Sequence, residues 1–80
     1  MPTTITLYSK PLCVQCDATK RKFNELGIPY TEVDVTEDAK ALARIKALGY
    51  LQAPVVELPN GERWSGFKID RIKRIKEGMQ

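Results

Sequence analysis

The only two cysteines of this 80-residue chain, Cys13 and Cys16, are separated by two residues. At this spacing two thiols can close into a disulfide and open again, which is typical of redox motifs at a strand-to-helix junction. The pair follows a short apolar run, Ile5-Thr6-Leu7-Tyr8, and begins a segment with helical periodicity. The pattern predicts a dithiol–disulfide electron carrier whose only redox group is this cysteine pair, with no further cofactor.

The position of the pair predicts different roles for its two sulfurs. Cys13 lies where the helix begins, and the unpaired backbone N–H groups and the positive end of the helix dipole stabilise a thiolate there. We expect its sulfur to be the more acidic and the more exposed, with Lys10 adding a positive charge nearby. Cys16 lies one turn later, on the face that carries Thr19 and Phe23, so we expect a buried resolving thiol. Cys13 would attack a partner's disulfide, and Cys16 would then release the reduced partner.

A metal site is the alternative use of a cysteine pair. The chain has no histidine and no third cysteine, so a four-ligand site of Cys and His cannot be built within one chain. Metal binding would need a second chain or added carboxylates, and we expect no metal. A non-catalytic binding or metal-bridging module remains the competing hypothesis. The lack of histidine also excludes a cysteine nucleophile that is activated by histidine.

Composition and charge narrow the class of protein. The net charge is +3, and much of the basic excess lies in the last segment, where Asp70 and Glu77 interrupt it. This pattern favours the solvated face of a terminal helix over a nucleic-acid surface. No apolar run approaches the length of a membrane span, and the first residues do not resemble a signal peptide. We therefore expect a single domain over residues 1–80, cytoplasmic and monomeric, without nucleic-acid or membrane partners.

Hydrophobic periodicity predicts four strands and three helices. Strands are expected at 4–8, 28–35, 55–58 and 62–65, and helices at 14–26, from the N-cap Thr36 to about residue 48, and between Phe67 and Met79. The first two strands should be parallel, whereas Pro59-Asn60-Gly61 predicts an antiparallel hairpin. The result is an α/β chain in the order β-α-β-α-β-β-α, a four-stranded mixed sheet with helices on both faces, which resembles the minimal thioredoxin-like fold.

The whole chain resembles the glutaredoxin branch of the thioredoxin superfamily, and within it most closely the NrdH-redoxins. Three stretches carry the resemblance. The third of them is similar to the NrdH-redoxin signature Trp-Ser-Gly-Phe-Arg-Pro-Asp, with lysine in place of arginine and isoleucine in place of proline. The stretches are Cys13-Val14-Gln15-Cys16 with Lys10 before it, Gln52-Ala53-Pro54-Val55 at the position of the family's cis-proline loop, and Trp64-Ser65-Gly66-Phe67-Lys68-Ile69-Asp70.

The resemblance implies both partners and geometry. NrdH-redoxins take electrons from NADPH through thioredoxin reductase and pass them to the large subunit of class Ib ribonucleotide reductase. Pro54 should be cis and face the Cys13 sulfur, and the Ala53 backbone should pair with a docking peptide strand. An apolar rim for the partner would be formed by Leu12, Val14, Ala53 and the loop of Trp64, Ser65, Gly66 and Phe67.

The residues themselves leave two of these roles open. Trp64 is either a partner contact or a strand residue packed against the last helix. Phe67 is more simply explained as a core anchor for that helix than as a contact residue.

A glutathione-dependent glutaredoxin is the alternative function. The residues between the thiols are Val14-Gln15, where glutaredoxins commonly have Pro-Tyr. The stretch Ser65-Gly66-Phe67-Lys68 is bulky and basic, where glutaredoxins have Gly-Gly followed by small or acidic residues. Both differences count against tight glutathione binding, although Lys10 remains available for a carboxylate.

Overall fold

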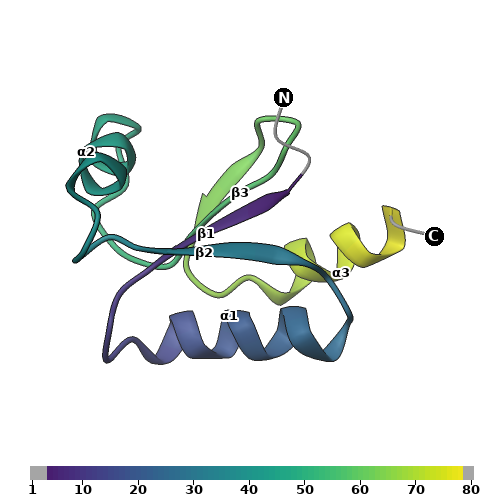
Figure 1. Cartoon of the computed structure of the whole chain (residues 1–80). Coiled ribbons are helices and arrows are strands. Elements are labelled where there is room, and N and C mark those ends of the chain that lie inside the picture. Colours follow the sequence, from purple (N-terminus) through teal and green to yellow (C-terminus); the bar gives the residue numbers. More distant parts are fainter. Residues whose placement is uncertain (1–3, 79–80) are drawn as a thin grey trace.

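The chain alternates strands and helices through its first half and then completes its sheet with a hairpin. The computed structural model describes residues 4–78, and Figure 1 shows the arrangement of its elements. The predicted order β-α-β-α-β-β-α is confirmed. The elements are β1 (Ile5–Ser9), α1 (Val14–Glu25), β2 (Tyr30–Asp34), α2 (Ala39–Ala47), β3 (Val55–Glu57), β4 (Arg63–Ser65) and α3 (Ile69–Gly78).

The sheet is mixed, as predicted, with the strand order β2-β1-β3-β4. β1 is parallel to β2, which α1 connects by a crossover. β1 is antiparallel to β3, and β3 is antiparallel to β4. The hairpin turn contains Gly61 at φ +94°, a left-handed conformation that glycine adopts at little cost. Leu58 N–H donates to the Glu62 carbonyl at 2.8 Å and closes this turn.

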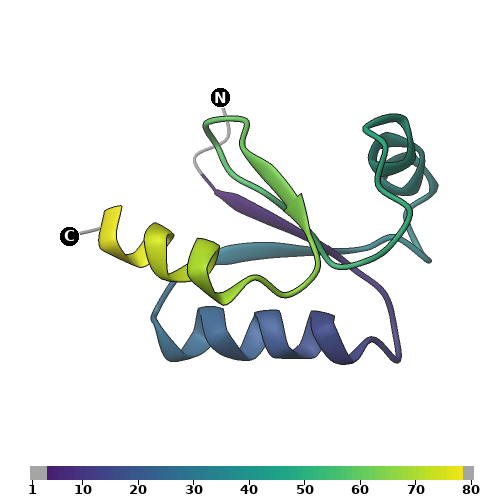
Figure 2. The same cartoon turned by 180° about the vertical axis from the view of Figure 1, so that it is seen from behind.

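The two faces of the sheet carry separate apolar clusters. Figures 1 and 2 show α1 and α3 on one side of the sheet and α2 on the other. Neighbouring strand residues alternate between the faces: Leu7 and Val56 belong to the α1/α3 cluster, whereas Tyr8 and Val55 belong to the α2 cluster. The predicted helices on both faces are therefore confirmed.

The predicted start of the second helix is wrong. Asp38, not Thr36, is the N-cap, and its side-chain Oδ1 accepts a hydrogen bond from Ala41 N–H at 3.0 Å. Thr36 instead donates from its backbone and hydroxyl to the Asp34 side chain. A turn after β2, in which Glu37 N–H and Asp38 N–H both donate to the Asp34 carbonyl, delays the helix by two residues. Strand ends also differ from the prediction by one or two residues.

The last helix uses less of its apolar face than its sequence predicts. Ile72 is fully buried, but Ile69 and Phe67 are each 38% exposed. The interpretation of Phe67 as a core anchor is therefore wrong, because the chain turns outward after Gly66. Met79 lies outside the described residues. Among residues 4–78, no helix has the length and apolar character needed to cross a lipid bilayer.

Candidate active site

The two cysteines lie in and just after the loop that joins β1 to α1. Cys13 is the N-cap of α1, with extended backbone angles, φ −117° and ψ 104°. Its sulfur forms a disulfide with the sulfur of Cys16. The Cys16 N–H, one of the unpaired amides of the first helical turn, donates to the Cys13 Sγ at 3.1 Å. The same amide can stabilise a negative charge on that sulfur when the disulfide is reduced.

The burial of the two cysteines follows the predicted order but not the predicted extent. Cys16 is fully buried and Cys13 is 8% exposed. Cys13 is thus the more accessible residue, but the expectation of an exposed sulfur is too strong. The reason is tertiary, since Ala53, forty residues away in sequence, lies against it: Cys13 Sγ is 3.8 Å from the Ala53 carbonyl oxygen. After reduction a Cys13 thiol could donate a hydrogen bond to this oxygen.

The loop before β3 contains Ala53 and so provides the residue that partly buries Cys13. The Ala53–Pro54 peptide bond is cis, which confirms the geometry that the family resemblance implied. Pro54 is buried, whereas Ala53 is half-buried. A partner peptide can therefore approach the backbone of Ala53 without displacing Pro54 from the core.

The third stretch of the resemblance contacts both of the other two. Gly66 N–H donates to the Pro54 carbonyl at 2.8 Å. Gly66 has φ +85°, and a Cβ atom built on it would lie 3.4 Å from the side-chain oxygen of Gln15, between the two cysteines. The positive φ favours glycine here, and the distance to Gln15 shows that the third stretch packs against the residues between the cysteines. All three sequence stretches therefore meet around Cys13.

The other predicted site residues lie at different depths. Trp64 is 4% exposed, packs in the α1/α3 cluster and lies under the Arg71 guanidinium, 5.7 Å from its ring centroid. The structure thus favours the core interpretation of Trp64 over a direct partner contact. Ser65 is half-buried at the end of β4, opposite Val55 of β3. Lys10 is exposed, between β1 and the cysteines.

Several exposed apolar side chains lie on the segments around the disulfide. Some are neighbours of the cysteines in sequence, and others belong to the segments that the Gly66–Pro54 hydrogen bond joins. We call it the apolar rim and define it as Leu12, Val14, Leu51 and Phe67, which are 103%, 84%, 87% and 38% exposed. Three of these belong to the rim predicted from the sequence, whereas the predicted members Ala53 and Trp64 are half-buried and buried. Leu51 was not predicted, although its place two residues before Ala53 was a usable signal. Exposed apolar side chains on the segments that meet near the disulfide indicate a surface for a partner.

A polar network holds the cysteine loop's flanking elements together. Glu32 Oε2 on β2 accepts hydrogen bonds from the Ser9 hydroxyl at 2.7 Å and from Lys20 Nζ at 3.0 Å. The Ser9 hydroxyl and the Lys20 ammonium lower the pKa of Glu32 below its usual value, and the bond to Glu32 raises the pKa of Lys20. The network joins the end of β1, just before the cysteines, to β2 and α1.

Two further carboxylates on the strands, Asp34 and Glu57, bind side chains outside the cysteine site. Asp34 accepts hydrogen bonds from Thr36. Glu57 pairs with Arg44 at 2.6 Å and accepts a hydrogen bond from the Tyr8 hydroxyl at 3.1 Å. Within residues 4–78, neither carboxylate is hydrogen-bonded to a cysteine. No cluster of three or more His, Cys, Asp or Glu side chains suited to a metal ion is found in the same part of the chain.

Comparison with known proteins agrees with this site. A glutaredoxin family model matches residues 5–64. The glutaredoxin-like protein NrdH of Escherichia coli is 38% identical over 71 residues, which cover 89% of this chain and 86% of that protein. The N-acetyl-S-hydroxy-L-cysteine reductase of Bacillus subtilis is 34% identical over 73 residues, which cover 89% of this chain and 77% of that protein.

Comparison of folds leads to the same group. The solved structure of the E. coli NrdH-redoxin, described as a glutaredoxin-like protein with a thioredoxin-like activity profile, superposes with a TM-score of 0.85. It is 38% identical, and the match covers 89% of this chain and 92% of that one. With its disulfide at the start of α1 and the cis Ala53–Pro54 bond against it, the chain is a thiol–disulfide oxidoreductase that belongs to the glutaredoxin family and, within it, to the NrdH-redoxins.

Proposed function

We propose that this protein carries electrons from NADPH, by way of thioredoxin reductase, to the large subunit of class Ib ribonucleotide reductase in the cytoplasm. The observation that carries the proposal is the hydrogen bond from Gly66 N–H to the Pro54 carbonyl at 2.8 Å. This bond brings the stretch from Trp64 to Asp70, whose sequence is similar to the NrdH-redoxin signature, to the rim of the disulfide. In this proposal, the stretch that selects the partner adjoins Pro54, whose peptide bond with Ala53 lies against the Cys13 sulfur.

The proposed cycle moves two electrons through the disulfide. A dithiol of thioredoxin reductase attacks the Cys13–Cys16 bond, which leaves two cysteine thiols here and a disulfide in the reductase. The Cys13 thiolate then attacks the disulfide of ribonucleotide reductase, forming a mixed disulfide and releasing one thiolate. Cys16 attacks the Cys13 sulfur, which restores the disulfide and releases the second thiolate of the partner. The two protons lost by Cys13 and Cys16 balance the two that the partner's thiolates take up.

The site divides this work between its residues. The Cys16 N–H stabilises charge on the Cys13 sulfur. The apolar rim provides the area that a partner covers, and the Ala53 backbone pairs with the partner's peptide strand. We expect the protein to act as a monomer, because both half-reactions use the same sulfur and a stable dimer over the rim would block it.

Glutathione is the alternative reductant, and the exposed Lys10 is the observation in its favour. A glutathione carboxylate could pair with its ammonium group. The stretch after Gly66, however, has exposed Phe67 and Lys68, and Val14, which lies between the cysteines in sequence, is 84% exposed. These bulky side chains favour a protein partner over a small tripeptide.

The test compares two reducing systems with one substrate. Reduction of insulin disulfides should proceed with NADPH and thioredoxin reductase, and the reduced protein should support turnover of class Ib ribonucleotide reductase. Cys13→Ser should abolish both activities, whereas Cys16→Ser should accumulate a mixed disulfide with the partner. No turnover with thioredoxin reductase, together with efficient turnover by glutathione and glutathione reductase, would assign the protein to the glutathione-dependent class instead.

A further inference from the structure

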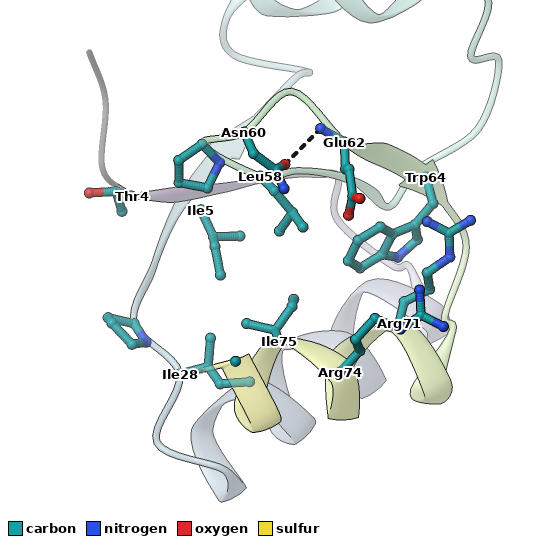
Figure 3. A pocket seen from close by; sticks show the side chains of 13 residues that line it. Thr4, Ile5, Ile28, Leu58, Asn60, Glu62, Trp64, Arg71, Arg74 and Ile75 are labelled. Atoms are coloured by element: carbon teal, nitrogen blue, oxygen red, sulfur yellow. Dashed lines mark hydrogen bonds between the residues drawn. The ribbon is translucent and has the colours of Figure 1, made fainter. Parts of the chain in front are cut away.

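A cavity unrelated to the cysteines opens at the opposite end of β1. Its volume is about 700 Å³, and it lies between the start of β1, the residues just before β2, the β3–β4 hairpin and the exposed side of α3 (Figure 3). Ile5, Ile28, Leu58 and Ile75 give it an apolar lining. Ligand sites in proteins commonly have volumes of about 300–1,000 Å³ and mostly apolar walls. The size and lining of this cavity therefore fit a small molecule.

One wall of the cavity is rich in hydrogen-bond donors. Trp64 lines it, and the buried Nε1–H of this residue has no hydrogen-bond partner in the described chain. Leaving a buried N–H group without a hydrogen bond lowers stability, so such a group indicates a place where a ligand could supply an acceptor. Figure 3 shows Arg71 and Arg74 reaching from α3 toward the same indole ring. Neither arginine forms an ion pair with another residue between 4 and 78.

We propose that this cavity binds a small amphipathic carboxylate. The apolar body of the ligand would lie on Ile5, Ile28 and Ile75, and the carboxylate would lie beside Trp64, between the two guanidinium groups. An ionised carboxylate accepts hydrogen bonds only, offers about four acceptor positions and matches the planar fork of arginine. It would supply the acceptor that this donor-rich wall lacks. This site is independent of the proposed electron-transfer function.

Glu62 makes it possible to test whether the ligand of this cavity is an anion or a cation. It extends from the hairpin toward the indole of Trp64, whereas the arginines extend from α3, and it is the only acidic residue among those that line the cavity. Its carboxylate repels a bound anion and attracts a cation. Glu62→Gln should therefore tighten the binding of an anion, and the opposite result is expected for a cationic ligand.

The experiment titrates the oxidised full-length protein with octanoate and, in parallel, with octanol, and follows binding by heteronuclear NMR correlation spectra. Trp64 is the only tryptophan, so a single indole N–H signal reports on the cavity. Octanoate should shift this signal saturably and bind more tightly than octanol. Arg74→Gln and Arg71→Gln should each weaken octanoate by about tenfold, the loss expected for one charge-assisted hydrogen bond.

Lys73→Gln is the matched control, because it removes the same charge from the same helix but Lys73 does not line the cavity. It should leave octanoate affinity within about twofold. Arg74→Gln should also retain wild-type insulin reduction, since Arg74 is remote from the disulfide. Three results would each overturn the proposal. They are equal affinities for octanol and octanoate, signal shifts confined to Leu12, Val14 and Phe67, and equal losses of octanoate affinity in Lys73→Gln and Arg74→Gln.

Discussion

Leu12, immediately before Cys13, combines a left-handed backbone with a fully exposed side chain. Its φ is +57°, in a region where a Cβ atom crowds the following carbonyl, and its side chain is 103% exposed. Because the side chain buries nothing within the chain, packing does not offset this backbone cost. Substitution of Leu12 should therefore change the free energy of unfolding through the backbone angle φ. It should change activity separately, through the loss of apolar surface from the rim.

The expected magnitudes follow from these two properties. The left-handed conformation costs a residue with a Cβ about 1–2 kcal/mol. Glycine avoids that cost but loses about 0.5–1 kcal/mol through its greater freedom in the unfolded chain. Leu12→Gly should thus raise the free energy of unfolding by roughly 0–1.5 kcal/mol. Leu12→Val should lower it by about 0.5–1 kcal/mol, because β-branched residues tolerate positive φ worst.

The same variants predict a loss of partner binding. Burying a leucine side chain contributes about 1.5–3 kcal/mol, so Leu12→Gly should raise the KM for a protein disulfide by about tenfold or more if the partner covers this residue. Leu12→Met is the control, because it keeps both the apolar surface and the Cβ, and it should resemble the wild type in both measurements.

The assays are urea unfolding of the oxidised proteins, followed by circular dichroism, and insulin reduction with thioredoxin reductase. A loss of more than about 1 kcal/mol in Leu12→Gly, or equal stability of Leu12→Val and the wild type, would refute the argument from φ. An unchanged KM in Leu12→Gly would remove Leu12 from the docking surface.

Two further predictions concern stability. The Ser9 hydroxyl and Lys20 lower the pKa of Glu32 in the folded state. The ionised Glu32 therefore contributes its full stabilisation above the ordinary glutamate pKa of about 4.3, and this contribution is lost as the pH falls through the lower folded-state pKa. Glu32→Gln should therefore flatten the decline in unfolding free energy below about pH 5 in urea titrations, and an unchanged acid decline would contradict the assignment. Asp38→Ala should cost about 1 kcal/mol in thermal or urea unfolding, because it removes the N-cap of α2. Thr36→Ala should cost clearly less, and the reverse order would restore Thr36 as the cap.

The order of elements could be predicted from sequence because each one carries its own local signal. Apolar positions three or four residues apart mark α1, and Asn60-Gly61 marks the hairpin. The start of α2 could not be predicted in this way. Thr36 and Asp38 are both suitable N-caps, and the choice depends on the turn that the Asp34 carbonyl closes after β2 leaves the sheet. That turn depends on where β2 stops pairing with β1, which is a tertiary property.

The site was predictable in its chemistry but not in its depth. The spacing of Cys13 and Cys16 gives their roles, whereas the burial of Cys13 depends on a loop forty residues away. Trp64 and Phe67 illustrate the same limit. The pairing of Trp64 with Val56 directs the indole into the core, and the positive φ of Gly66 then turns Phe67 outward. Neither the register nor the turn is evident from the two aromatic residues alone.

On the proposed function, control of the reacting sulfur and choice of partner lie in different parts of the same surface. Within residues 4–78, the hydrogen-bond contacts of the Cys13 sulfur are with two backbone groups, the Cys16 N–H at 3.1 Å and the Ala53 carbonyl at 3.8 Å. Side-chain substitutions on the apolar rim leave both groups in place, provided that the fold holds Pro54 and Gly66 together. Rim substitutions should therefore change KM for individual partners much more than the rate of disulfide exchange with a small dithiol. A rim variant that slowed exchange with dithiothreitol as much as with insulin would show that the rim also controls the sulfur.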